Sequence, residues 1–358
     1  IVAETIAFEI PLKKVTENIS VLELFHGPTL AFKDVGARFM SRCLGYFLKN
    51  ETRKVTVLVA TSGDTGGAVA NGFYDVEGIE VVILYPKNRV SPVQEKQLTA
   101  LGKNIHALEV NGSFDDCQAL VKQAFSDESL NEKLLLTSAN SINVARWLPQ
   151  QIYYVLALKQ WLKINSENPV ICVPSGNFGN ICAGILAHHR GLPVEHFIAA
   201  CNVNDVVPEY LRTEILKPKE TVATISNAMD VGDPSNFVRI LELFEKEFNQ
   251  VKSKLSGYTI DDEETLKTIE RVEKDYGYVL DPHGAVAFVA LEKYLAENGG
   301  KGFFLETAHP VKFPDSVEKA TGKSVEIPKS LEELMRQEKF TTEINPQYEE
   351  LKEFLLKK

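Results

Sequence analysis

The chain has 358 residues, of which 44% are hydrophobic and 25% charged, and its formal net charge is −10 at pH 7. This length and composition are typical of a soluble globular protein with two domains. The negative charge argues against broad nucleic-acid binding, and no apolar run is long enough to predict a membrane span. The five scattered cysteines favour reduced thiols and a cytoplasmic location, and the opening residues IVAETIAFEI do not resemble a signal peptide.

Segments typical of strands and helices alternate along the chain, which predicts an α/β fold with mostly parallel sheets. In the first half, an apolar helix is expected after residue 33. Strands and helices are then expected in turn at residues 55–60, 66–73, 81–85, 91–101, 105–110, 114–125 and 134–137. We expect residues 46–141 to form a smaller α/β domain.

The second half begins with a predicted long, buried helix at residues 144–162. Further strands and helices are expected at residues 170–173, 181–189, 197–200, 236–255, 262–276, 282–297 and 302–305. We expect residues 1–45 and 142–328 to form a larger α/β domain, and residues 329–358 to form a C-terminal helical tail.

A turn with the sequence SGNFGN, at residues 175–180, lies between a predicted strand and a predicted helix. Gly176 and Gly179 allow successive backbone N–H groups to point at one place, and the following helix N-terminus completes an anion site suited to a phosphate. The glycine spacing matches neither a Walker loop nor a dinucleotide-binding loop. A tight turn without a ligand explains the same residues, and this motif alone does not decide between the two.

A second polar turn, TSGDTG at residues 61–66, also lies between a predicted strand and a predicted helix. Its hydroxyl and N–H groups suit a carboxylate. Local hydroxyl-centred turns and a helix N-cap are the simpler interpretation of this motif when it is taken alone.

Lys33 follows three apolar residues and precedes a largely apolar helix. A lysine amine in apolar surroundings loses its proton more readily and becomes a nucleophile. A surface lysine paired with Asp34 is the commoner arrangement for such a residue. Late in the chain, the segment LETAHPVKF places Thr307 and His309 at the end of a predicted strand, where strand-end capping explains them equally well.

The adjacent histidines 188 and 189 are the one hint of a metal site. Neighbouring side chains on a helix point about 100° apart, and no cysteine or carboxylate completes a ligand set at a suitable spacing. We therefore expect no metal.

A nucleophilic lysine, a turn for a carboxylate, a phosphate site and a strand-end hydroxyl, in that order, are the groups needed to bind pyridoxal 5′-phosphate (PLP). The segments that carry them resemble the threonine synthases of bacteria and fungi, from about residue 21 to residue 327. The resemblance rests on FHGPTLAFKDVG, ATSGDTGGAVA, TSANSINVARWLPQ, VPSGNFGN, SNAMDVGDPSN, DPHGAVA and ETAHPVKF.

The resemblance implies fold type II of the PLP enzymes, which is similar to the tryptophan synthase β fold, with PLP bound by the larger domain and the active site between the domains. It implies a lyase of amino-acid biosynthesis that converts O-phospho-L-homoserine and water to L-threonine and phosphate by γ-elimination and β-hydration. It leaves open whether the chain is a monomer or a homodimer. Family members usually carry several dozen residues before the position of Ile1, and the resemblance leaves open whether this segment is truncated, disordered or divergent here.

The resemblance also implies roles for individual residues. Lys33 is the catalytic residue and forms the Schiff base with PLP. The other cofactor-binding residues would be Asp64 near the phenolic oxygen, Thr307 at the pyridine nitrogen, and Gly176, Asn177, Phe178, Gly179 and Asn180 at the phosphate. The substrate carboxylate would bind Ser62, Gly63 and Thr65, and the substrate phosphate would bind Asn140, Ser141 and Arg146.

Two other functions use the same groups. One is a threonine or serine dehydratase of the same fold type, and the other is a pseudoenzyme that binds PLP and phosphorylated ligands without turnover. Dehydratases lack the segments DPHGAVA and ETAHPVKF as they are spelled here. Every chemical group that turnover needs is present, so the sequence favours a threonine synthase.

Overall fold

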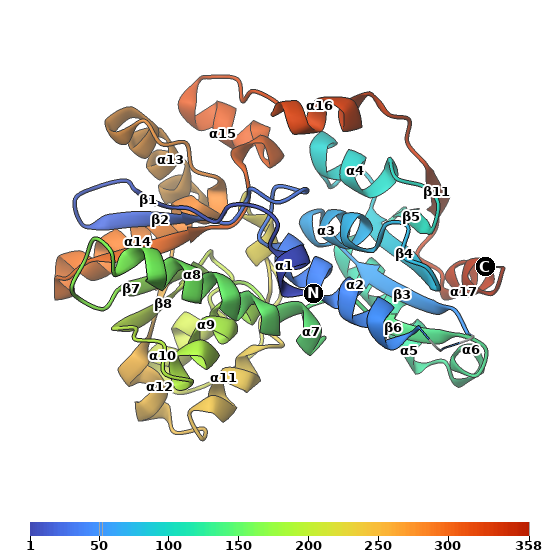
Figure 1. Cartoon of the computed structure of the whole chain (residues 1–358), viewed down its shortest axis with the longest axis horizontal. Coiled ribbons are helices and arrows are strands. Elements are labelled where there is room, and N and C mark those ends of the chain that lie inside the picture. The colour runs from blue at the N-terminus through green and yellow to red at the C-terminus, as the bar shows by residue number, and fades with distance from the viewer. Residues whose placement is uncertain (50, 52, 358) are drawn as a thin grey trace. The chain divides into compact units, whose positions relative to one another are not determined.

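The computed structural model describes residues 1–49, 51 and 53–357. The chain divides into two compact units, each built on its own sheet (Figure 1). The smaller unit comprises Ile1–Ala7, Lys33–Arg146 and Ile327–Lys358, and the larger unit comprises Phe8–Phe32 and Trp147–Glu326.

The smaller unit contains a five-stranded sheet in the order β11-β5-β4-β3-β6, in which every pair is parallel. Its strands are β3 (Val55–Ala60), β4 (Ile79–Pro86), β5 (Ile105–Val110), β6 (Leu135–Ser138) and β11 (Thr341–Ile344). Its helices are α1 (Val2–Thr5), α2 (Lys33–Phe47), α3 (Asp64–Phe73), α4 (Pro92–Thr99), α5 (Phe114–Ser126), α6 (Glu128–Asn131), α16 (Lys329–Arg336) and α17 (Tyr348–Leu356), and α7 (Val144–Trp147) crosses the boundary to the larger unit.

Helices cover both faces of this sheet. Alternate residues of β4 face opposite sides, so that Val81 and Ile83 join the core under α2, α3 and α4, while Val82 and Leu84 join the core under α5 and α17. A parallel sheet that is covered on both faces needs apolar residues at successive positions, and this explains the run Val81–Tyr85 in the central strand β4.

The larger unit contains a six-stranded sheet in the order β1-β2-β10-β7-β8-β9, in which β1 is antiparallel to β2 and the other pairs are parallel. Its strands are β1 (Leu12–Lys14), β2 (Ile19–Glu23), β7 (Val170–Pro174), β8 (His196–Cys201), β9 (Leu255–Thr259) and β10 (Gly302–Glu306). Its helices are α8 (Gln151–Trp161), α9 (Gly179–His189), α10 (Val206–Thr213), α11 (Phe237–Leu243), α12 (Phe248–Lys254), α13 (Asp262–Tyr276), α14 (Pro282–Asn298) and α15 (Pro314–Thr321), with 3₁₀ turns η1 (Leu148–Gln150), η2 (Asn227–Met229) and η3 (Pro310–Lys312).

The core of the larger unit lies where α14 packs on the middle of its sheet. Val286 and Phe288 of α14 pack with Cys172 of β7 and Phe304 of β10, and the ring of Phe288 meets that of Phe304 edge-on at 5.6 Å between centroids. The sequence prediction of an α/β fold with two mostly parallel sheets is therefore confirmed.

The boundaries of the two units differ from the expected ranges of 46–141 for the smaller domain and 1–45 with 142–328 for the larger. Helix α2 belongs to the smaller unit because it packs closely on α3, where a Cβ placed on Gly72 would lie 3.0 Å from the carbonyl carbon of Ala37. Residues 329–358 are not a separate helical tail, because β11 pairs in parallel with β5, with Thr341 opposite Ala107.

Two predicted long helices are also interrupted. The helix expected at residues 144–162 is α7, η1 and α8, and the break falls at Pro149, which has no N–H to donate to the preceding turn. The helix expected at residues 236–255 is α11 and α12, separated by Glu245 and Lys246, which both have positive φ angles. The residues after α12 form the strand β9, which the sequence pattern missed.

Candidate active site

The turn at residues 175–180 joins β7 to α9 in the larger unit. Ser175 extends the sheet by donating its N–H to the carbonyl of Ala200 at 2.8 Å, and its hydroxyl donates to the carbonyl of Val173 at 2.8 Å. Phe178 has a left-handed φ of 61°, and α9 begins at the next residue. The first N–H groups of a helix have no acceptor within it. A left-handed step followed by these N–H groups is a backbone arrangement suited to an anion.

Asn180 provides a second sign that this turn suits a phosphate. Its side-chain oxygen accepts a hydrogen bond from Tyr154 Oη at 2.8 Å and lies 2.5 Å from the hydroxyl of Tyr153. Its side-chain nitrogen is buried and has no hydrogen-bond partner among the residues that the structure describes. A buried amide donor without an acceptor costs about 1–3 kcal/mol, and a bound phosphate oxygen would remove that cost. The residues present here therefore fit the cofactor phosphate.

Thr307 directly follows β10, the parallel neighbour of β7, so it lies at the same carboxyl edge of the sheet as the turn 175–180. Its side chain is buried, and its carbonyl accepts the N–H of Phe32 at 2.9 Å. Ala31 forms a bridge with Ala308. Two segments far apart in the sequence, LAFKD and ETAHP, are thus hydrogen-bonded to one another, and Phe32 is the residue before Lys33.

The turn at residues 61–66 joins β3 to α3 in the smaller unit. The hydroxyl oxygen of Thr61 accepts the N–H groups of Gly63 and Gly66, both at 2.9 Å. Gly63 has a φ of 137°, which favours glycine. Because the Gly63 N–H is bonded to Thr61, a substrate carboxylate in this turn would depend on Ser62 and Thr65, which are both half-buried.

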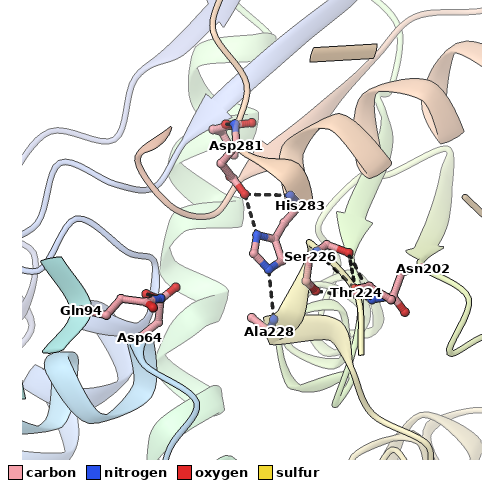
Figure 2. A network of polar contacts seen from close by, with 9 residues as sticks. Asp64, Gln94, Asn202, Thr224, Ser226, Ala228, Asp281 and His283 are labelled. Atoms are coloured by element: carbon pink, nitrogen blue, oxygen red, sulfur yellow. Dashed lines mark hydrogen bonds and ion pairs between the residues drawn. The ribbon is translucent and has the colours of Figure 1, made fainter. Parts of the chain in front are cut away.

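Asp64 begins α3 and is buried. Gln94, from the first turn of α4, donates its side-chain N–H to Asp64 Oδ1 at 2.9 Å (Figure 2). Gln94 also closes a capping box with Ser91, which fixes the position of its side chain. The carboxyl group expected near the phenolic oxygen of the cofactor is therefore oriented by a neutral amide.

The segment after β6 carries the three residues expected at the substrate phosphate. Asn140 donates its side-chain N–H to the carbonyl of Ala60 at 2.9 Å, and this bond connects it to the last residue of β3. Ser141 is half-buried. Arg146 is only 5% exposed, and its guanidinium donates to the carbonyl of Ala139. Arg146 is therefore a buried arginine of the smaller unit.

Burial lowers the pKa of Arg146 to about 10, while the nearby Asp34 opposes that shift. Lys33 is half-buried and is the first residue of α2. This helix begins against Arg146, since a Cβ on Gly36 would lie 2.1 Å from the Arg146 carbonyl oxygen. The structure thus gathers the predicted residues in two groups. The smaller unit brings together the start of α2, the turn 61–66 and the segment 140–146, and the larger unit brings together the turn 175–180 and Thr307.

Several buried polar residues near these groups were not singled out from the sequence. They are Gln94, Asp281, His283, Glu306 and Lys312, all at most 2% exposed. The serine and glutamine of the Ser91–Gln94 capping box are a readable signal for the place of Gln94. No spacing or periodicity marks the other four as buried, although all four lie in segments that carry the family resemblance.

Among the described residues, no helix is both long and apolar enough to span a membrane.

Comparison with known proteins identifies the relatives of this chain. Residues 9–303 match the family model described as "Pyridoxal-phosphate dependent enzyme", and residues 284–355 match "Threonine synthase, C-terminal". A threonine synthase of Buchnera aphidicola from Acyrthosiphon pisum is 47% identical over 358 residues, which cover 100% of this chain and 82% of that protein.

Two solved structures are similar along almost the whole chain. Threonine synthase from Escherichia coli has a TM-score of 0.91 and 46% identity, covering 99% of this chain and 82% of that one. PLP-bound threonine synthase from Brucella melitensis has a TM-score of 0.89 and 37% identity, covering 97% of this chain and 80% of that one.

The chain belongs to the pyridoxal-phosphate-dependent enzymes of fold type II. Its two sheets are mostly parallel, and each has a polar turn at the carboxyl end of one of its strands. Within the class, the near-complete matches make it a member of the threonine synthase family.

The contact between Gln94 and Asp64 leads to a stability prediction. Gln94→Leu removes a donor from a buried carboxyl group and breaks the capping box of α4, so the free energy of unfolding should fall by about 1–3 kcal/mol. The exposed Gln118 on α5 provides a matched control, and Gln118→Leu should change the free energy by less than about 0.5 kcal/mol. Urea unfolding of the two variants measures both values, and equal stabilities would contradict the importance of this contact.

Proposed function

We propose that this chain is a PLP-dependent threonine synthase that converts O-phospho-L-homoserine and water to L-threonine and inorganic phosphate. The observation that carries the proposal is the match to threonine synthases over the full length of the chain, at 47% identity. The proposal is supported by the groups that this reaction requires, an amine at Lys33, a turn suited to phosphate at residues 175–180 and a neutral hydroxyl at Thr307. The five free cysteines support a reducing compartment, and we propose the cytoplasm.

We propose that Lys33 would hold the cofactor through its side-chain amine. The N–H groups of residues 176–180 and the side chain of Asn180 would bind the cofactor phosphate, and the hydroxyl of Thr307 would meet the ring nitrogen. Asp64 would lie at the phenolic oxygen. Two ionised oxygens in contact repel, so Asp64 and that oxygen would share a proton, and the hydrogen bond from Gln94 would orient the carboxyl group for this.

When bound, PLP supplies an electron sink that stabilises negative charge on the substrate α carbon. Lys33 Nζ removes the proton from the α carbon and moves protons between the α and β carbons. Loss of a β proton allows the γ phosphate to leave as inorganic phosphate. A proton then adds to the γ carbon, which becomes the methyl group of threonine. Water adds at the β carbon, so that its oxygen becomes the threonine hydroxyl, and a proton returns to the α carbon.

Ser62 and Thr65 would bind the substrate carboxylate, and Asn140, Ser141 and Arg146 would bind the substrate phosphate. An arginine suits this role because its planar fork of donors matches phosphate oxygens. The substrate phosphate needs its own site because the turn at residues 175–180 is already assigned to the cofactor.

A comparison of substrates tests the proposed function against its alternatives. The holoenzyme should release phosphate from O-phospho-L-homoserine and form threonine in equal amount, and it should form little 2-oxo acid from threonine or serine. A dehydratase would show the opposite preference. A pseudoenzyme would bind PLP and O-phosphohomoserine but release no phosphate, and either result would contradict the proposal.

The neutral partner at the ring nitrogen leads to a prediction about product ratio. Thr307→Asp should favour a protonated nitrogen and therefore raise transamination relative to threonine formation. Thr307→Ser keeps the hydroxyl and should keep the wild-type ratio. Amounts of keto acid and threonine from O-phosphohomoserine measure the effect, and the same ratio in all three proteins would count against the assignment of Thr307.

A further inference from the structure

A buried aspartate–histidine pair lies at the start of α14 in the larger unit. Asp281 is 0% exposed and His283 is 2% exposed. Asp281 Oδ1 lies 2.6 Å from His283 Nδ1 and also accepts the backbone N–H of His283 at 2.7 Å. On the other side of the ring, the backbone N–H of Ala228 donates to His283 Nε2 at 3.2 Å (Figure 2).

These contacts determine which ring nitrogen carries the proton. The N–H of Ala228 can only donate, so His283 Nε2 is the acceptor. The proton is therefore on Nδ1, which donates to the carboxylate of Asp281. His283 thus connects a fixed carboxylate to one backbone N–H of the 3₁₀ turn η2.

The backbone of Asp281 is also fixed by a hydrogen bond. The backbone N–H of Asp281 donates to Glu306 Oε1 at 2.6 Å. Gly284 leaves room for this acid, since a Cβ at that position would lie 1.6 Å from Glu306 Oε2. Glu306 is the last residue of β10, so the pair is anchored to the strand that carries Thr307 at its end.

Ala228 belongs to a segment that packs directly on the turn 175–180. A Cβ on Gly176 would lie 2.6 Å from the Cα of Met229 and 2.9 Å from the carbonyl oxygen of Ala228, so only glycine allows this approach. Further along the same segment, Ser235 donates its N–H to Asn177 Oδ1 at 2.7 Å. The segment from residue 226 to residue 236 therefore contacts the turn twice. Ala228 and Met229 lie against Gly176, and Ser235 is bonded to Asn177.

A second group of hydrogen bonds, centred on Asp230, holds the segment 226–236 in place. Thr224 Oγ1 donates to Asp230 Oδ1 at 2.6 Å, and the side chain of Asn202 donates to the same oxygen at 2.8 Å. This cluster fixes the segment relative to the end of β8. His283 fixes the part that lies against Gly176.

We propose that Asp281 and His283 are positioning residues for the cofactor phosphate. Through the hydrogen bond to Ala228 they hold residues 226–229 against Gly176, and this contact keeps the N–H groups of the turn directed at one point. The inference rests on the proposed role of residues 176–180 at the phosphate. It adds two residues that act on that site through the neighbouring segment and do not touch the cofactor.

Two substitutions of His283 separate its two hydrogen bonds. The amide of asparagine lies where Nδ1 lies, so His283→Asn keeps a donor for Asp281 but does not reach Ala228. The amide of glutamine extends to the position of Nε2, so His283→Gln keeps an acceptor for the Ala228 N–H. His196, a buried histidine on β8 that is bonded to Ser256 Oγ at 2.9 Å, provides a matched control through His196→Asn.

The measurement is the dissociation constant of the full chain, freed of cofactor, for PLP and for pyridoxal, which lacks the phosphate. Wild type should bind PLP far more tightly than pyridoxal. His283→Asn should lose roughly tenfold or more in PLP affinity, the size expected for one buried hydrogen bond, with its affinity for pyridoxal unchanged. His283→Gln should stay close to wild type, and His196→Asn should leave the ratio of the two constants unchanged.

Each other outcome has a distinct meaning. Equal losses for PLP and pyridoxal in His283→Asn, or no loss for either, would overturn the positioning role. A wild type that does not prefer PLP over pyridoxal would instead overturn the assignment of the turn 175–180 to the phosphate. If His283→Asn does not fold, Asp281→Asn gives the same comparison, because it removes the charge that holds the proton on Nδ1 and should reduce PLP affinity alone.

Discussion

Replacing Lys33 with alanine should abolish both the covalent attachment of PLP and the turnover of O-phosphohomoserine. The variant loses the amine that is proposed to hold the cofactor and to move protons between the substrate carbons. Proton transfer by a positioned side chain typically contributes 10²- to 10⁴-fold, so kcat should fall by roughly 10³-fold or more. The measurements are the visible absorption band of the purified protein, trapping of the cofactor with borohydride, and phosphate release.

Lys49 provides the control for this experiment. It is an exposed lysine that follows α2, so Lys49→Ala removes a lysine amine from the same part of the chain without touching the proposed site. That variant should keep the absorption band and normal turnover. A Lys33→Ala protein that still carries a borohydride-reducible cofactor would show that another lysine is the attachment point.

Arg146→Leu should have the second largest effect, and it should act on stability as well as on catalysis. Arg146 is buried and donates to the carbonyl of Ala139, and the charge of the buried Asp34 favours its charged form. Breaking a buried ion pair costs about 3–5 kcal/mol, and the electrostatic interaction of Arg146 with Asp34 sets this as the upper limit, so the free energy of unfolding should fall by up to that amount. If Arg146 also binds the substrate phosphate, kcat/KM should fall by the equivalent of about 2–5 kcal/mol.

A double variant separates the two roles of Arg146. Asp34→Asn combined with Arg146→Leu removes both buried charges, so much of the lost stability should return. If Arg146 binds the substrate phosphate, kcat/KM should stay low in this more stable protein. If kcat/KM returns together with the stability, Arg146 is a structural residue, and the second phosphate site must be sought elsewhere.

Two strands of the smaller sheet could be predicted from the sequence because apolar residues occupy most of their positions. Strands β3 and β5 have the predicted bounds because they are central strands that are covered on both faces, so most of their residues are buried and apolar. Strand β11 was missed because three of its four residues are exposed, and only Ile344 is buried. Its place in the sheet depends on pairing with β5, a contact far away in the sequence.

In the candidate site, features with a local sequence pattern could be predicted, and features that depend on contacts between distant residues could not. The turns 61–66 and 175–180 could be predicted because glycine and hydroxyl residues between an apolar strand and a helix have a local physical meaning. The burial of Arg146 could not be predicted, since it depends on the close approach of Gly36 on α2. The bond from His283 to Ala228 joins residues 55 positions apart, and no local pattern indicates it.

The most direct test of the proposed reaction uses water labelled with heavy oxygen. The holoenzyme is given O-phospho-L-homoserine in this water, and both products are analysed by mass spectrometry. Elimination followed by hydration breaks the bond between the γ carbon and oxygen, so we predict one labelled oxygen in the hydroxyl of threonine and none in the released phosphate. Labelled phosphate together with homoserine would mean hydrolysis at phosphorus, and that result would contradict the account.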